Sequence, residues 1–155
     1  MNLWKRLKEP IHQSDLMPVI RQGIFMSFTG GLLIGAMHLL FTFLFNFSLT
    51  WLMLFVLAHL IARRIKNAYI EYHVIYSIIS IIFFIIAYYI MSLTLYGGLF
   101  YINNIIDPKL YLMLLNPIQY FIFLNPLTTY FLTVENLIEV IFFIIGTLYA
   151  YRYSK

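Results

Sequence analysis

The feature that most constrains this chain is a stretch of forty residues without a charged side chain, from Gly23 to Ala62. As a helix it would be about 60 Å long, whereas the hydrocarbon core of a bilayer is about 30 Å thick. One membrane crossing cannot use that length, but two can. The best break lies at Asn46-Phe47-Ser48, where polar and turn-compatible residues interrupt the apolar run. The stretch therefore predicts two membrane-spanning helices joined by a tight connection.

Composition extends this prediction to the whole chain. Of the 155 residues, 63% are hydrophobic and only 10% are charged, against about 25% charged in a typical soluble domain. A water-soluble fold could not bury so much apolar surface, so the sequence predicts an all-α integral membrane protein with a single membrane domain over residues 1–155. Cysteine is absent, which excludes a disulfide, a thiolate metal site and a cysteine nucleophile.

The apolar runs predict a bundle of four transmembrane helices, at residues 24–45, 48–62, 74–96 and 137–151. Gly97-Gly98 is expected to end the third of them. Residues 1–22 alternate basic and apolar side chains and contain two prolines, which predicts an interfacial segment that lies on the membrane. A docking site for a soluble partner is the alternative for this segment.

The stretch 97–135 is apolar on balance but is interrupted by Asp-Pro and Asn-Pro pairs. Asn116-Pro117 and Asn125-Pro126 each resemble a helix start, with asparagine as the N-cap and proline at the first helical position. Short helices that lie in the outer interface, or that re-enter the membrane, are the prediction. A fifth span over residues 110–133 is the alternative.

The distribution of Lys and Arg favours four spans. With four, nine of the ten basic residues fall on one side of the membrane, and only Lys109 lies on the other. The positive-inside rule then places both termini in the cytoplasm of a multi-pass cell-membrane protein. A fifth span would move Arg152 and Lys155 to the outside. The abundance of Ile, Phe, Tyr and Asn suggests a bacterial source.

Small residues recur every fourth position on the first span, at Gly23, Ser27, Gly31 and Gly35. On a helix they form one smooth stripe, which allows another backbone to approach closely. Packing against the second or fourth span of the same chain is the first interpretation. The second is an interface with a partner membrane protein or with a second copy of the chain. The lipid bilayer is the partner in either case.

Three ionisable residues inside predicted spans are candidates for a proton or ligand path, namely His38, His59 and Glu139. The two histidines are interpreted either as satisfied core residues or as a proton-handling pair. Glu135 and Glu139 share one helix face. A capping box, with Asn136 as N-cap and Glu139 at the third helical position, would explain Glu139 structurally. A cation gate is the functional alternative.

No catalytic, cofactor or metal-binding motif is present in the sequence. Nucleic-acid binding is also excluded, because the basic residues are dispersed among separate ends of the helices. The first functional expectation is a non-catalytic membrane subunit within a transport, secretion or envelope-assembly complex. A small proton-coupled transporter is the second. An intramembrane lipid-modifying enzyme is the third, and it requires one polar set to converge: Asn103, Asn104, Asp107, Asn116, Asn125 and Glu135.

Overall fold

A computed structural model describes residues 13–45, 49–105, 107–129 and 131–155 of the chain. In these ranges the structure is helical and contains no strand, so the prediction of an all-α chain is confirmed for them. Three helices are long and apolar enough to cross a membrane: α2 (Gln13–Phe45), α4 (Val74–Ile102) and α6 (Val134–Tyr153). A fourth long helix, α3 (Thr50–Lys66), has 17 residues and is therefore about 26 Å long.

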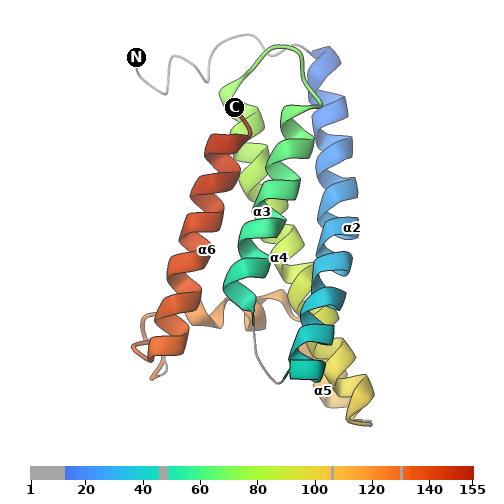
Figure 1. The fold of residues 1–155 in the computed structure, drawn as a ribbon, viewed down its shortest axis with the longest axis vertical. Helices are drawn as coiled ribbons and strands as arrows, with labels where there is room; N and C mark the ends of the chain where they lie inside the picture. Colours follow the sequence, from blue (N-terminus) through green and yellow to red (C-terminus); the bar gives the residue numbers. More distant parts are fainter. Residues whose placement is uncertain (1–12, 46–48, 106, 130) are drawn as a thin grey trace.

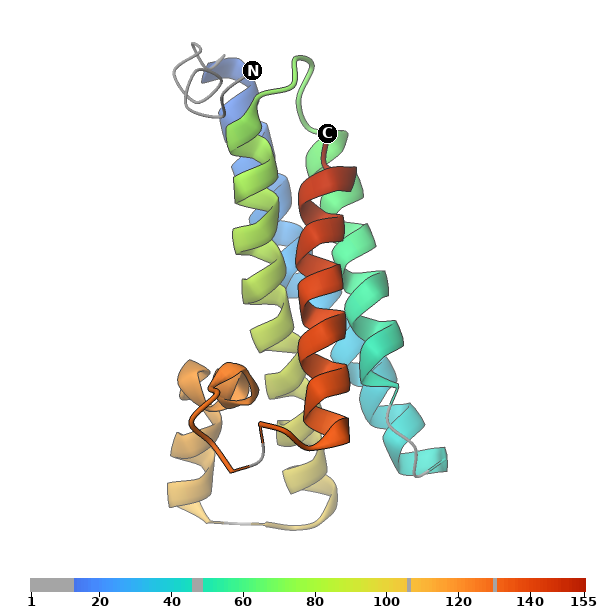
Figure 2. The same cartoon turned by 90° about the vertical axis from the view of Figure 1, so that its left-hand side faces the viewer.

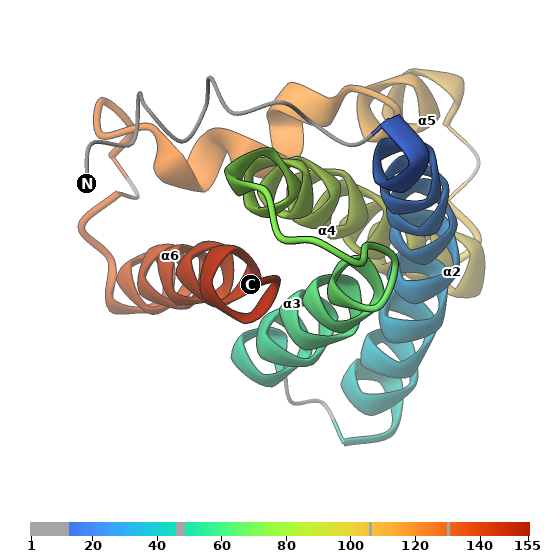
Figure 3. The same ribbon diagram turned by 90° about the horizontal axis from the view of Figure 1, so that it is seen from above.

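The four long helices run alternately up and down and lie side by side (Figure 1). Seen from above, α3 and α4 occupy the centre of the bundle (Figure 3). Each of them contacts the three other long helices, whereas α2 and α6 do not contact each other in the described ranges. This arrangement makes α3 and α4 the elements that hold the bundle together.

The two ends of the bundle differ in character. One end, called here the basic end, carries the α3–α4 connection, the start of α2 and the C-terminus (Figure 1). Its basic side chains are Arg63, Arg64, Lys66, Arg152 and Lys155. The opposite end carries the short helix α5 (Pro108–Leu114) and the 3-10 helix η1 (Pro117–Leu124), which lie across α4 and α6 (Figure 2). It is called the α5–η1 end.

The stripe of small residues on α2 packs against α4. A β-carbon added at Gly31 would lie 2.9 Å from the carbonyl oxygen of Ala87, and one added at Gly35 would lie 2.6 Å from that of Met91. Such distances show that the two helix backbones are in direct contact. The stripe is thus used inside the chain, on α4 rather than on the second or fourth predicted span. It leaves no open surface for a partner at these positions.

The structure moves three helix boundaries by four residues or more, of which the smallest change is at the end of the second predicted span: it continues from residue 62 to Lys66 as α3. Helix α2 begins at Gln13, inside the segment expected to be interfacial, and Pro18 lies within it; residues 1–12 of that segment lie outside the described residues. One proline removes one helical hydrogen bond, which membrane helices tolerate. Helix α4 continues through Gly97-Gly98 and ends at Ile102, where Asn104 adopts φ 52°. Asparagine here supplies the left-handed residue that glycine was expected to supply.

The stretch 97–135 contains no continuous helix long enough for a fifth span in its described residues, so that alternative is wrong there. Asn116 begins η1 as predicted, since its side-chain oxygen accepts a hydrogen bond from the Ile118 amide at 3.1 Å. Asn125 accepts from the Leu127 amide in the same way, at 3.0 Å, but only turns follow. An Asn-Pro pair therefore forms the local cap at both places and starts a helix at one.

The first turn of α2 anchors the α3–α4 connection through Asp15. This buried carboxylate accepts hydrogen bonds from the backbone amides of Ile70 and Glu71, at 3.1 and 3.2 Å. Asp15→Ala should lower the free energy of unfolding by about 1–3 kcal/mol, because both amides lose a charged acceptor. Thermal unfolding in detergent measures this. Asp15→Asn, which keeps one acceptor oxygen, should recover part of the loss; equal stability of Asp15→Ala and wild type would contradict the anchor.

A second polar cluster closes the basic end. The Tyr69 hydroxyl donates to the Ser154 carbonyl oxygen at 2.6 Å, and the Ser154 hydroxyl lies 3.1 Å from that of Ser77 in α4. Burial raises the pKa of Tyr69 to about 12, with smaller contributions from Tyr72 and Tyr76. The Tyr69 phenol therefore remains a donor at physiological pH, and the C-terminal turn stays tied to the α3–α4 connection.

Candidate functional site

The candidate site lies toward the α5–η1 end and is organised around Glu139 of α6. One carboxylate oxygen of Glu139 accepts a hydrogen bond from the Tyr88 hydroxyl of α4 at 2.8 Å. No ion pair to Glu139 occurs among the described residues, although its helix is apolar enough to span a membrane. A carboxyl group held in this way by a neutral phenol can exchange a proton or receive a cation.

The predicted capping box is wrong. Helix α6 begins at Val134 with Thr133 as its N-cap, so Glu139 is one and a half turns inside the helix. The Asn136 amide instead donates to the carbonyl oxygens of Phe123 and Phe131, at 3.0 and 3.1 Å. Asn136 thus ties α6 to the segment that precedes it. Glu139 is free to make the tertiary contact with Tyr88.

A cavity of about 620 Å³, called here the central cavity, lies between the four long helices. Helix α2 contributes His38 to its wall, α3 contributes Thr50, and α6 contributes Glu135 and Glu139. The remaining polar wall comes from Tyr88, Ser92 and Tyr96 of α4. All four helices therefore place a polar side chain on one cavity, which is partly open because Trp51, Tyr96 and Glu135 on its wall are exposed.

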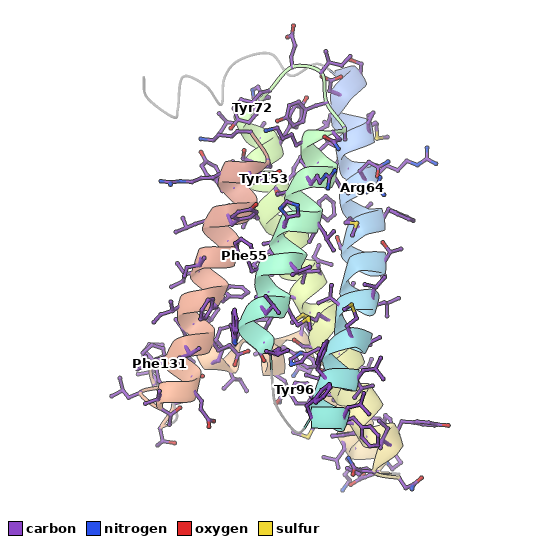
Figure 4. The ribbon with its side chains drawn as sticks, viewed as in Figure 1. Phe55, Arg64, Tyr72, Tyr96, Phe131 and Tyr153 are labelled. Carbon is purple, nitrogen blue, oxygen red and sulfur yellow. The ribbon has the colours of Figure 1, made fainter. Side chains whose placement is uncertain are left out.

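A second cavity of about 330 Å³, called the side cavity, lies between α4, α5, η1 and α6. Tyr88, Tyr96 and Glu139 line both cavities, so the carboxylate stands at the boundary between them. Figure 4 shows the labelled Tyr96 at this end of the bundle, far from Arg64, Tyr72 and Tyr153 at the basic end. The two cavities together bring polar side chains of α2, α3, α4 and α6 to the α5–η1 end of the bundle.

Tyr88 is fixed in place by aromatic packing. It is 3% exposed, and its ring contacts those of Phe121, Phe123 and Phe143 at centroid distances of 5.2 to 5.8 Å. Such edge and tilted contacts define the orientation of the ring. The phenol is therefore held in position to donate to Glu139.

Two further tyrosines hold the α5–η1 segment over the side cavity. Tyr89 donates to the Leu115 carbonyl oxygen at 3.0 Å, and Tyr120 donates to that of Leu114 at 2.8 Å. These carbonyls end α5, where the helix leaves acceptors without internal partners. Burial, with contributions from Tyr89 and Tyr96, raises the pKa of Tyr120 to about 12, so its phenol remains a donor.

The three residues of the predicted proton or ligand path do not lie together. His38 is 1% exposed and lines the central cavity with Glu139, and its Nε2 atom lies 3.5 Å from the Thr50 hydroxyl. His59 lines neither cavity. Its Nδ1 atom lies 2.9 Å from the Tyr149 hydroxyl, and its ring contacts that of Tyr153. The structure thus brings together His38 and Glu139 and separates His59 from both.

Sequence reasoning missed the tyrosines of the site. Tyr88, Tyr96 and Tyr120 carry no charge, so the pattern of charged and imidazole side chains inside spans did not indicate them. The signal that could have found Tyr88 is a phenol deep in an Ile-rich helix, since a buried hydroxyl requires a partner. Its partner is Glu139, the one carboxylate already singled out inside a span.

The polar set required by an enzyme does not converge. Asn103, Asp107, Asn116 and Asn125 are exposed, and their side chains hydrogen-bond nearby backbone groups. Asn104 is exposed and follows the end of α4. Of the six residues that the enzyme hypothesis required, Glu135 lines the central cavity. No group of three or more potential metal ligands occurs in the described residues.

Comparison with protein-family models, with curated proteins and with solved structures found no match. The geometry of the site is therefore the basis for its interpretation. The carboxylates of Glu139 and Glu135, the Tyr88 phenol and the His38 imidazole line shared cavities and can bind and release a proton or a cation.

Proposed function

We propose that this chain is a small, non-catalytic, proton-coupled transporter of the cell membrane. Glu139 is the residue at which the proton and the transported solute bind. The observation that carries the proposal is the position of Glu139, inside an apolar helix, bonded to Tyr88 and facing two cavities. Carboxylates and histidines placed on internal cavities of membrane bundles mark ion and proton paths. His38 on the same central cavity supports a relay between the two groups.

A membrane topology follows from the proposal. We place all four long helices across the bilayer, with the basic end and both termini in the cytoplasm. Helix α3, at about 26 Å, is somewhat shorter than the hydrocarbon core, and slight thinning of the bilayer or anchoring by its terminal Arg63 and Arg64 compensates. The α5–η1 segment then lies in the outer interface and the cavities open toward that side.

The two other functional expectations have less support. The small-residue stripe motivated a subunit of a larger complex, and that stripe is occupied by α4. The exposed apolar faces of α2 and α6 suit lipid as well as a partner protein. The lipid-modifying enzyme required convergence of the outer polar residues, which cap helices and turns instead.

The test is proton flux in liposomes that contain the purified protein and a trapped pH-sensitive dye. Wild-type protein should change the internal pH after an external acid pulse, and Glu139→Gln should reduce the rate to that of protein-free liposomes. His38→Gln should slow it as well. His59→Gln and Glu71→Gln are the matched controls, because they make the same chemical changes outside both cavities, and both should retain the wild-type rate.

The pH dependence of the flux identifies the group that titrates. The titratable groups that face Glu139 are Tyr88 and Tyr96 of α4, Tyr120 of η1, His38 of α2 and Glu135 of its own helix. Glu139→Gln should abolish the pH-dependent component of the proton flux. In Glu135→Gln the flux should still depend on pH, because Glu139 is present. Flux that persists unchanged in both Glu139→Gln and His38→Gln would refute a proton path through this site.

A further inference from the structure

The side cavity has the composition of a site for an organic cation. Aromatic side chains from two elements line it: Tyr88, Tyr96 and Phe100 from α4, and Tyr120 and Phe123 from η1. Its volume of about 330 Å³ is at the lower end of the range for small-molecule sites. Clusters of aromatic faces around one space are the arrangement that recognises quaternary and other organic ammonium groups.

The charge of the side cavity points the same way. Glu139 is the one carboxylate on its wall, and no Lys, Arg or His side chain lines it. The ionised carboxylate would therefore repel an anion and attract a monovalent cation. A divalent metal is disfavoured, because magnesium and calcium need six or more oxygen ligands and the wall offers few.

The remaining wall sets the shape of the ligand. Leu110, Met113 and Leu114 of α5 form an apolar side of the cavity, which suits an aryl or alkyl body. Tyr96 is 47% exposed, and its ring centroid lies 5.9 Å from that of Tyr120. The two rings thus lie beside each other, with Tyr96 exposed and Tyr120 buried. A cationic head near Glu139 and an apolar body against α5 match this wall, to which Gln119 of η1 adds one neutral polar side chain.

We infer that the side cavity binds a monovalent organic ammonium compound with an apolar body, held by Glu139 and by the faces of Tyr96 and Tyr120. The inference rests on the proposed transport role and names the class of solute that Glu139 exchanges against a proton. The solute reaches Glu139 from the α5–η1 end. The central cavity, which Glu139 also lines, then provides the path of the proton through His38.

The test uses the full chain in lipid nanodiscs and isothermal titration with benzyltrimethylammonium. Benzyl alcohol serves as the neutral comparison and phenylacetate as the anion. Benzyltrimethylammonium should bind at least about tenfold more tightly than benzyl alcohol, a preference of the size expected for one desolvated carboxylate and an aromatic cage, and phenylacetate should not bind. Glu139→Gln should remove the preference for the cation, and Glu139→Asp, which keeps the charge, should retain it.

The aromatic contribution has its own pair of variants. Tyr96→Leu should weaken binding of benzyltrimethylammonium by about five- to tenfold, and Tyr96→Phe should stay within about twofold of wild type. The inference would be overturned if Tyr96→Leu and Tyr96→Phe weakened binding of benzyltrimethylammonium equally. It would also be overturned if the cation and benzyl alcohol bound equally well, or if Glu139→Gln bound the cation as tightly as wild type.

Failure of the inference is distinguishable from failure of the proposed function. Proton flux through Glu139 in liposomes without any binding of benzyltrimethylammonium would refute the ammonium site and leave proton transport standing. Binding that depends on Glu139 and on the ring of Tyr96, in a protein without proton flux, would support the site and refute the coupling.

Discussion

Gly35→Ala should destabilise the protein by about 1–3 kcal/mol, the usual range for an overpacked contact. The added β-carbon would lie 2.6 Å from the Met91 carbonyl oxygen and 2.7 Å from the Thr94 β-carbon of α4. Backbone atoms cannot rotate away, so α2 and α4 must separate. Gly35→Leu should prevent folding into a monodisperse species in mild detergent. Thermal unfolding and size-exclusion chromatography measure both variants.

Gly97→Ala is the matched control, since it makes the same substitution within a long helix. An added β-carbon at Gly97 would meet no heavy atom within 4 Å. Because alanine favours the helix over glycine by about 1 kcal/mol, Gly97→Ala should be neutral or stabilising. If Gly35→Ala and Gly97→Ala had equal melting temperatures, the close α2–α4 contact would be refuted.

Single cysteines at the two ends of the bundle should react from opposite sides of the membrane. The sequence contains no cysteine, so Lys109→Cys and Lys155→Cys each introduce a thiol that has no competitor for the reagent in the chain. In intact cells a membrane-impermeant maleimide should label Lys109→Cys and should not label Lys155→Cys. The difference is close to all or none, because the bilayer excludes the reagent.

Disrupted cells provide the control, since both cysteines should then react. Asn67→Cys, at the end of α3, should behave like Lys155→Cys if α3 crosses the membrane. Labelling of Asn67→Cys in intact cells would refute four crossings, and labelling of Lys155→Cys would refute the orientation.

Much of the fold was predictable because lipid imposes simple rules on sequence. Span length and helical periodicity located the long helices, and the stripe at Gly31 and Gly35 indicated a close helix contact. The partner of that stripe was not predictable, because every apolar helix of the chain offers a surface of similar composition. Boundaries shifted where local signals competed with tertiary contacts, as at Gly97-Gly98 and at Pro18.

The candidate site was predictable only in part. His38 and Glu139 stood out as ionisable residues inside spans, and the structure places both on the central cavity. The pairing of Glu139 with Tyr88 depends on the relative rotation of α4 and α6, which sequence spacing within one helix cannot give. The capping box illustrates the same limit. The spacing of Asn136 and Glu139 predicted hydrogen bonds within the first turn of a helix, but both side chains instead bond to other parts of the chain.

The absence of contact between α2 and α6 in the described ranges has a mechanical consequence. The α2–α4 seam is rigid, because glycine lets backbone rest on backbone, while α6 faces α4 mainly through aromatic side chains near Tyr88 and Phe143. Side chains can slide and repack where backbones cannot. Helix α6 also packs against α3, where the ring of Phe55 contacts that of Tyr149. If the proposed transport moves Glu139 toward the basic end, we therefore expect α6 and α3 to move together against the α2–α4 pair.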